Sequence, residues 1–143
     1  CMAVDADIDG VDTEGMREYL LNTPVVYAVV FGSRIRGDST PTSDVDLGVQ
    51  FPEQMSDRVR FDVRNRIDAE LQSYADSFVD VSDVERLPIR VAARALRDGR
   101  VLYVEEGVVA DDRQRFEEQV AAEAEDRQRH RRDVIDRLAE GSS

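Results

Sequence analysis

"VVYAVVFGSRIRGDSTPTSDVDLGVQF", residues 25–51, contains two predicted strands and the long polar loop that joins them. The apolar, β-branched run 25–31 lies between a proline and a glycine, which is typical of a buried strand. Residues 44–51 alternate between apolar and polar side chains, so Asp44 and Asp46 lie on the same face of a second strand. Strand interiors disfavour aspartate, so two aspartates on the same face of one strand need a chemical reason.

A divalent cation would explain the paired aspartates. Asp44 and Asp46 repel each other when both are charged, and a cation between them removes that repulsion. Ligation by oxygen alone selects a hard ion such as Mg²⁺ or Mn²⁺. Asp80 lies in a second alternating segment, 77–84, between two valines. If this strand pairs beside the first, the three carboxylates converge at one end of the sheet, as in a two-metal site.

Gly32 and Ser33 follow the first strand and predict a phosphate-binding turn. Glycine lets the backbone approach a phosphate, while the serine hydroxyl and the amides at the start of a following helix can hold its oxygens. The loop 34–43 is long enough to place Ser33 and the aspartates on opposite sides of a triphosphate. A Gly-Ser pair alone predicts only an ordinary turn, but the three aspartates favour phosphoryl or nucleotidyl transfer.

The rest of the chain predicts helices around these strands. The spacing of apolar residues predicts a short helix after the Gly32 turn, longer helices over 13–21, 56–74, 88–99 and 111–138, and a last strand over 101–104. Thr13 and Ser56 are predicted N-caps. We therefore expect an α/β (α+β) fold, in which a small mixed sheet is flanked by helices and followed by a C-terminal helix. Residues 1–143 are expected to form a single domain, with a core over 11–105 and a helical segment over 110–140.

The composition limits the classes of function. The 143 residues carry a net charge of −12, and all 19 basic residues are arginine. A negative field argues against direct nucleic-acid binding, which needs many cationic contacts with phosphates. An acidic chain without lysine is similar to proteins of halophilic microbes. The sequence shows neither a membrane-spanning run nor a signal-peptide pattern, so we expect a soluble, cytoplasmic protein without membrane partners.

Three segments resemble a known family. "GSRIRGDSTPTSDVDL", residues 32–47, is similar to the G-S-x10-D-x-D signature of the DNA polymerase β-like nucleotidyltransferase superfamily. "VDVSDVERLP", residues 79–88, and "LRDGRVLY", residues 96–103, resemble its small branch, the minimal nucleotidyltransferases or MNT antitoxins. The resemblance runs from about Val25 to Tyr103 and implies the polymerase β-like nucleotidyltransferase fold.

The resemblance also implies roles for six residues. These roles are phosphate binding for Gly32, Ser33 and Arg36, and metal binding with catalysis for Asp44, Asp46 and Asp80. Asp80 would bind the catalytic metal and favour deprotonation of the acceptor. The implied cofactors are Mg²⁺ or Mn²⁺, with ATP as the nucleotide donor. Arg36 is equally well explained as a surface charge that balances neighbouring acids.

The family implies a protein partner. Its members pair with a HEPN-domain ribonuclease toxin, and some transfer AMP from ATP to a toxin tyrosine, whereas others neutralise by binding. The resemblance therefore implies a protein adenylyltransferase that forms a hetero-oligomer with its HEPN toxin and silences it. Two alternatives stay open: a non-catalytic antitoxin that occludes the toxin, and a small-molecule nucleotidyltransferase. The latter needs a substrate domain, for which the 40 residues after Tyr103 are too few.

Overall fold

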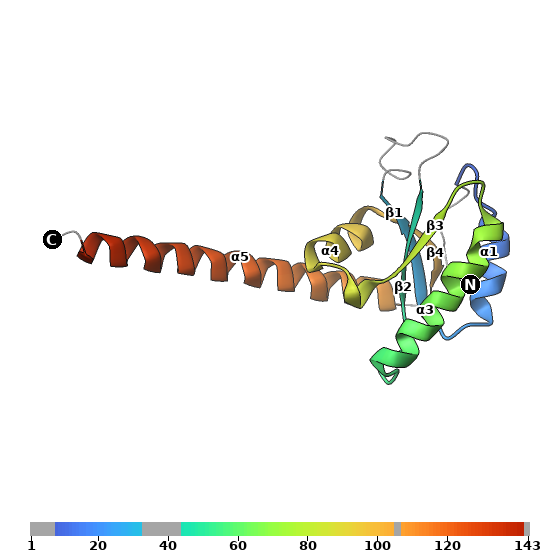
Figure 1. Cartoon of the computed structure of the whole chain (residues 1–143), viewed down its shortest axis with the longest axis horizontal. Helices are drawn as coiled ribbons and strands as arrows, with labels where there is room; N and C mark the ends of the chain where they lie inside the picture. The colour runs from blue at the N-terminus through green and yellow to red at the C-terminus, as the bar shows by residue number, and fades with distance from the viewer. Residues whose placement is uncertain (1–7, 33–43, 105–106, 142–143) are drawn as a thin grey trace.

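Four strands form one mixed sheet in the order β3-β2-β1-β4 (Figure 1). This computed structural model describes residues 8–32, 44–104 and 107–141. The strands are β1 (Tyr27–Phe31), β2 (Val45–Gln50), β3 (Val79–Asp83) and β4 (Arg100–Val104). β1 is antiparallel to β2 and β4, whereas β2 and β3 are parallel. The predicted mixed sheet is confirmed.

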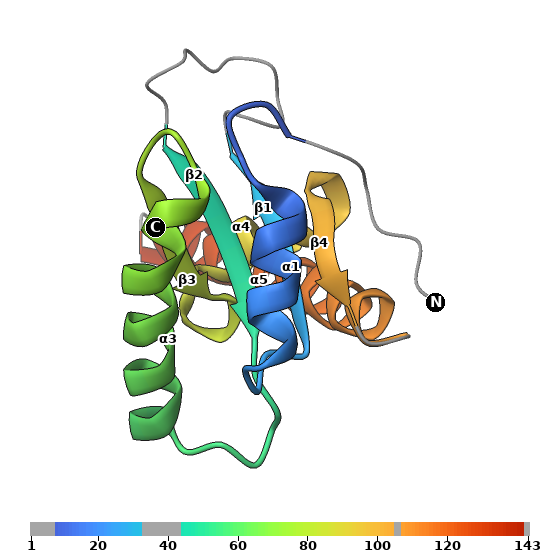
Figure 2. The same ribbon diagram turned by 90° about the vertical axis from the view of Figure 1, so that its right-hand side faces the viewer.

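Helices cover both faces of the sheet. They are α1 (Thr13–Leu21), α3 (Asp57–Leu71), α4 (Ile89–Asp98) and α5 (Val108–Gly141), with the short 3-10 turns η1 (Gln72–Tyr74) and η2 (Val84–Arg86). Figure 2 shows α1 and α3 in front of the sheet, with α4 and α5 behind it. The predicted short helix after the Gly32 turn falls on residues 33–43, outside the described part of the chain. The flanking helices and the C-terminal helix are confirmed, while the single-domain assignment stays a prediction.

The two faces of the sheet have separate apolar cores. The larger core joins the sheet to α1 and α3 and contains Met16, Leu20, Ala28, Val30, Val45, Leu47, Val49, Ile67, Leu71, Val79, Val81 and Leu102. The smaller core, on the other face, contains Tyr27, Val29, Val84, Ala92, Ala93, Leu96 and Phe116. Side chains alternate along every strand, so each strand can contribute to both faces. The apolar positions of β2 all belong to the larger core, which leaves its polar positions on the α4 face.

The polar face of β2 is open only at its beginning. Gly48 lies against Val84 and Phe31, where an added Cβ would come within 3.1 Å and 3.4 Å of side-chain carbons. Gln50 is buried, and its side-chain amide forms hydrogen bonds with the side chains of Glu85 and Arg60. The sequence predicted one polar face along the whole strand, and the structure restricts solvent access on that face to Asp44 and Asp46.

Two helix starts and one helix end can be compared with the sequence predictions. Ser56 caps α3 as predicted, since its Oγ accepts a hydrogen bond from the backbone N–H of Val59 at 3.3 Å. Gly99 ends α4 as predicted. Thr13 was predicted to cap α1, but Asp12 is the N-cap: its Oδ1 accepts from the N–H of Gly15 at 3.0 Å. An aspartate oxygen satisfies this free amide as well as a threonine hydroxyl would.

Side chains of α3 and of the turn after it cover the outer edge of the edge strand β3. They are spaced four residues apart on one side of the helix: Arg60, Arg64, Asp68 and Gln72. The Gln72 amide donates to the carbonyl of Val79 at 2.7 Å and accepts from its N–H at 2.9 Å. Asp68 accepts from the N–H of Val81 at 2.9 Å, and Arg64 donates to the Val81 carbonyl at 2.7 Å. These contacts replace a neighbouring strand and make the edge unavailable for strand addition.

We expect the substitution Gln72→Ala to lower the free energy of unfolding by about 1–3 kcal/mol, because it leaves both backbone groups of Val79 without their partner. Urea denaturation followed by circular dichroism measures this change. Arg66→Ala, at an exposed position of α3, is the matched control and should change stability by less than about 0.5 kcal/mol. Equal stability of the two variants would contradict the edge-covering role of Gln72.

The first turns of α5 are anchored to the sheet by buried contacts. Phe116 is buried among the smaller core. Asp112 accepts a hydrogen bond from the Tyr27 hydroxyl at 2.7 Å, and burial together with this bond raises the pKa of Tyr27 well above its usual range. Arg115 pairs with both Glu85 and Asp112. The start of the helix is therefore held by apolar and polar contacts together.

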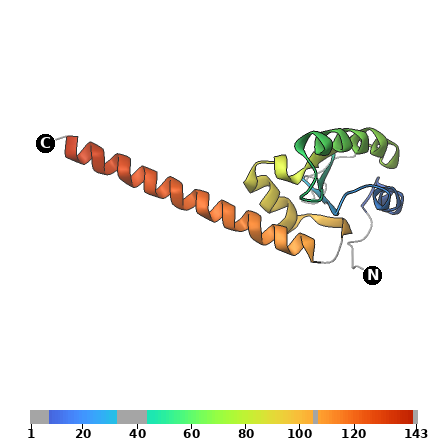
Figure 3. The ribbon, with the colours of Figure 1, turned by 90° about the horizontal axis from the view of Figure 1, so that it is seen from below.

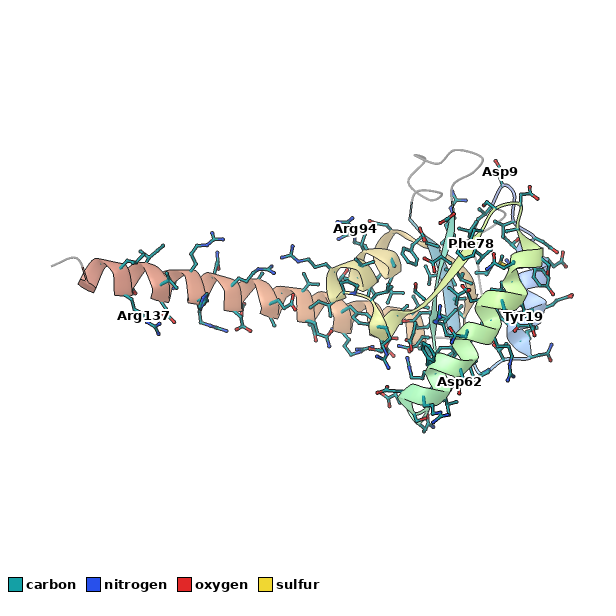
Figure 4. All side chains as sticks on the ribbon, in the orientation of Figure 1. Asp9, Tyr19, Asp62, Phe78, Arg94 and Arg137 are labelled. Carbon is teal, nitrogen blue, oxygen red and sulfur yellow. The ribbon has the colours of Figure 1, made fainter. Side chains whose placement is uncertain are left out.

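The rest of α5 projects away from the sheet (Figure 3). The helix has 34 residues and is about 50 Å long, and residues 121–139 are exposed on all sides. Figure 4 shows Arg137 on this projecting part, far from Tyr19, Asp62 and Phe78 on the body of the protein. His130, the one histidine of the sequence, is exposed on this part of the helix. Within the described residues, no helix combines the length and hydropathy needed to span a bilayer.

Candidate functional site

Four of the predicted site residues, Gly32, Asp44, Asp46 and Asp80, lie where β1 ends and where β2 and β3 begin. Asp46 of β2 is the register partner of Phe31 in β1, the residue just before Gly32. On its other side, Asp46 is the register partner of Asp80 in β3. Register partners on neighbouring strands share a face, with Cα atoms about 5 Å apart. The fold therefore brings Gly32, Asp46 and Asp80 to the same end of the sheet.

Gly32 is in direct contact with the Asp46 carboxylate. Its backbone φ is +85°, in the left-handed region that only glycine adopts readily. A Cβ at this position would lie 2.2 Å from Oδ2 of Asp46. Both the backbone conformation and the lack of space require glycine here. The close approach places the turn's backbone beside the carboxylate, where the sequence predicted phosphate and metal to meet.

Asp44 completes the acidic face. It lies two residues before Asp46, at the entrance to β2, and its side chain is exposed, as is that of Asp80. The donors fit a hard divalent cation chemically, because all are carboxylates on one face of adjacent strands. Over residues 8–32, 44–104 and 107–141, however, no three acidic, histidine or cysteine side chains are close enough together to hold a metal. The metal-ligand assignment of the three aspartates thus stays a prediction.

Two of the predicted phosphate-binding residues cannot be placed. Ser33 and Arg36 lie outside the described residues, so the structure says nothing about their contacts. Gly32, the third, is described and lies at the same end of the sheet as the aspartates. The candidate site is therefore defined here by Gly32, Asp44, Asp46 and Asp80.

A pocket beside Asp80 was not predicted from the sequence. It has a volume of about 630 Å³ and lies between the first half of α3, the strand β3 and the turn η2. Its lining includes Asp57, Arg58, Arg60, Phe61, Arg64, Asp80, Ser82, Asp83 and Arg86. The concentration of arginines near the start of α3 was visible in the sequence, but their position beside Asp80 depends on how α3 packs along β3.

Residues 14–108 match the family model described as polymerase beta, nucleotidyltransferase. This match covers more than half of the chain, so the protein belongs to the polymerase beta nucleotidyltransferase family. The match includes every element of the sheet and the whole of the candidate site. The predicted superfamily is thereby confirmed. A search of curated protein sequences finds no match.

Solved structures with the same fold include toxin–antitoxin assemblies. A chain from the crystal structure of a toxin–antitoxin with AMP-PNP aligns with a TM-score of 0.61 and 19% identity, over 90% of this chain and 98% of that chain. A chain of the toxin–antitoxin MntA–HepT aligns with a TM-score of 0.50 and 17% identity, over 89% and 96%. A protein described as a minimal nucleotidyltransferase aligns with a TM-score of 0.51 and 26% identity, over 61% and 85%. The chain is thus similar in fold to minimal nucleotidyltransferases.

Proposed function

We propose that this protein is an antitoxin nucleotidyltransferase that transfers AMP from ATP to a tyrosine hydroxyl of a cognate HEPN ribonuclease toxin, and so neutralises it. The observation that carries the proposal is the placement of Asp46 against Gly32 on one side and in register with Asp80 on the other. The likeness in fold to a toxin–antitoxin solved with AMP-PNP supports both the nucleotide and the class of partner.

The proposed reaction is an in-line transfer at the α-phosphorus of ATP. The tyrosine oxygen forms a bond to the α-phosphorus while the bond to the β-phosphate bridging oxygen breaks, so pyrophosphate leaves. Asp80, at the exposed edge strand, would take the proton of the attacking hydroxyl, while the Gly32 turn with Ser33 and Arg36 would hold the phosphates. Mg²⁺ or Mn²⁺, held by Asp44, Asp46 and Asp80, would supply charge neutralisation when bound.

The non-catalytic alternative assigns the same chain to occlusion of the toxin without transfer. Such an antitoxin needs a surface that binds the toxin, but it does not need the acidic site. A small-molecule nucleotidyltransferase would enclose its acceptor in a pocket, whereas Asp44 and Asp80 of the candidate site are exposed. The protein-acceptor proposal fits this architecture better, because an acceptor protein can itself cover an open site.

The test is a transfer assay. The full chain is incubated with the cognate HEPN protein, Mg²⁺ and ATP labelled in the α-phosphate, and the toxin's mass and ribonuclease activity are measured. We expect a mass increase of one or more AMP groups on a toxin tyrosine and a parallel loss of ribonuclease activity. Neutralisation without a mass change would instead establish the occluding antitoxin. Labelling of a small molecule but not of the toxin would reject both antitoxin hypotheses.

A further inference from the structure

The pocket beside Asp80 is an elongated groove that starts at the candidate site. Asp80 lies at the beginning of β3, and Arg86 lies just beyond its end, so the groove follows the strand for on the order of 10 Å. One wall is the first half of α3 and the other is β3 with η2. In the proposed reaction the acceptor hydroxyl must reach Asp80. In the described part of the protein this groove adjoins Asp80, so it can receive the residues of the acceptor protein next to that hydroxyl.

The charges of the lining favour an acidic occupant. Arg60 is paired with Asp83 inside the protein, which cancels both charges. The remaining charged residues of the lining are three arginines and two aspartates, namely Arg58, Arg64, Arg86, Asp57 and Asp80. Asp80 is committed to the reaction in the proposed function. Arg86 lies 3.9 Å from Asp57 in an exposed ion pair, which is weak and can exchange for another carboxylate. The lining as a whole has a net charge of +1 in a chain whose net charge is −12, so this groove is more favourable to a partner of opposite charge than the rest of the surface.

Phe61 adds an apolar contact surface to the groove. The residue is 58% exposed, so much of its ring is open to contact with a partner. The guanidinium of Arg64 lies 5.9 Å from the centroid of its ring, and the same side chain donates to the carbonyl of Val81. Arg64 is thus held in place, with an aromatic face beside it. An exposed aromatic ring next to a fixed arginine is typical of a protein-binding surface.

Recognition in this groove must use side chains. The backbone groups of Val79 and Val81 on the outer edge of β3 already bond to side chains of α3 and η1, so an incoming segment cannot add as a further strand. Arginines that bind carboxylates form charge-assisted, often bidentate hydrogen bonds, which are the strong class of polar contact. The groove therefore selects for acidic side chains and not for backbone conformation.

We propose that the groove lined by Arg58, Phe61, Arg64 and Arg86 binds an acidic segment of the acceptor protein that flanks the tyrosine to be modified. The proposal rests on the proposed function, because that function places the acceptor hydroxyl at Asp80. It adds the chemistry of the partner: carboxylates next to the acceptor tyrosine, bound by three arginines.

Binding is measured with two fluorescein-labelled heptapeptides that carry a central tyrosine, one flanked by six glutamates and the other by six glutamines. Fluorescence anisotropy is recorded with the full chain, Mg²⁺ and AMP-PNP at about 0.1 M salt, where surface charges are only partly screened. The test variant is Arg58→Glu/Arg86→Glu. The matched control, Arg66→Glu/Arg113→Glu, makes the same change in net charge at positions outside the groove.

The parent and the control should bind the glutamate peptide about tenfold or more tightly than the glutamine peptide, in line with the strength of charge-assisted contacts. The Arg58→Glu/Arg86→Glu variant should lose this preference while its unfolding curve matches that of the control. Equal affinity of the parent for both peptides, or a preserved preference in the test variant, would overturn the proposal.

A second measurement separates this proposal from the proposed function. In the transfer assay, Arg58→Glu/Arg86→Glu should raise the KM for the toxin about tenfold with kcat nearly unchanged, because the groove binds the acceptor and does not touch the reacting atoms. A parent chain that binds the acidic peptide but never labels the toxin would reject the transfer reaction alone. A parent that labels the toxin, with the test variant unchanged in KM, would reject the groove alone.

Discussion

Replacing Asp46 with asparagine should lower the rate of AMP transfer by about a thousandfold or more and leave the fold intact. Asparagine has nearly the same size and shape as aspartate, so it fits the space against Gly32 that the carboxylate occupies. What it removes is the negative charge. A neutral amide oxygen is a weak ligand for Mg²⁺ compared with a carboxylate, and it no longer offsets the cation that the triphosphate needs.

The position of Asp46 makes this the most informative of the three aspartates. It has strand neighbours on both sides, pairing with Phe31 in β1 and with Asp80 in β3. Asp44 and Asp80 are exposed, whereas Asp46 is half-buried. Asp46 is therefore the central residue of the site, with the Gly32 turn on one side of it and Asp80 on the other.

Rates are measured with labelled ATP and the cognate toxin, together with thermal unfolding of each variant. Asp62→Asn is the matched control, since it removes one exposed carboxylate on α3 outside the candidate site (Figure 4). The control should transfer AMP at the parent rate. Transfer by Asp46→Asn at more than about a tenth of the parent rate would reject the metal-ligand role. Full neutralisation of the toxin by Asp46→Asn without transfer would identify the occluding antitoxin instead.

Much of the fold was predictable because its signals are local. The strands alternate with period two and the helices repeat with period 3.6, so both could be recognised over short windows. The signals for helix ends were also local. Ser56 caps the start of α3. Gly99 ends α4, at a point where an added Cβ would lie 2.4 Å from the carbonyl oxygen of Ala95. The N-cap of α1 was misassigned by one residue because Asp12 and Thr13 are both good caps.

The candidate site was predictable in part. Asp44 and Asp46 share a face by spacing alone, which requires no knowledge of the fold. The position of Asp80 depended on which strands are neighbours, and the sequence stated this only as a condition. The parallel pairing of β2 with β3 confirms that condition, because it makes Asp80 the register partner of Asp46. The groove beside Asp80 could not be predicted, since it depends on the angle at which α3 lies along β3.

The buried hydrogen-bond network of Arg60, Gln50 and Asp83 was not predicted from the sequence, for a related reason. Its members lie on β2, α3 and β3, and no periodic pattern connects an arginine to a glutamine and an aspartate that are 10 and 23 residues away from it. Arg60 sits in the polar first half of α3 and would ordinarily be assigned to solvent. Only the tertiary fold shows that it is buried.

Arg60→Met should be the most destabilising single substitution in the protein's polar interior, lowering the free energy of unfolding by about 3–5 kcal/mol. Arg60, Gln50 and Asp83 are 8%, 6% and 4% exposed. Arg60 donates to both carboxylate oxygens of Asp83 at 2.8 Å and to Oε1 of Gln50 at 2.7 Å, and the Asp83 bond raises the pKa of the Arg60 guanidinium. The guanidinium carbon of Arg60 lies 5.3 Å from the centroid of the Phe51 ring. Methionine keeps a long side chain of similar length but leaves a buried carboxylate without its cation.

The double variant Arg60→Met/Asp83→Asn separates the lost charge from lost packing. The Asp83→Asn substitution keeps a side-chain oxygen for the N–H of Glu85, which caps η2, and removes the uncompensated charge. The double variant should therefore recover about 1–3 kcal/mol relative to Arg60→Met alone, because an unpaired buried charge accounts for much of the loss. Urea denaturation of the parent and the two variants measures both differences. A double variant no more stable than Arg60→Met would mean that Arg60 acts through packing, and that the ion pair with Asp83 contributes little to holding α3 against the sheet.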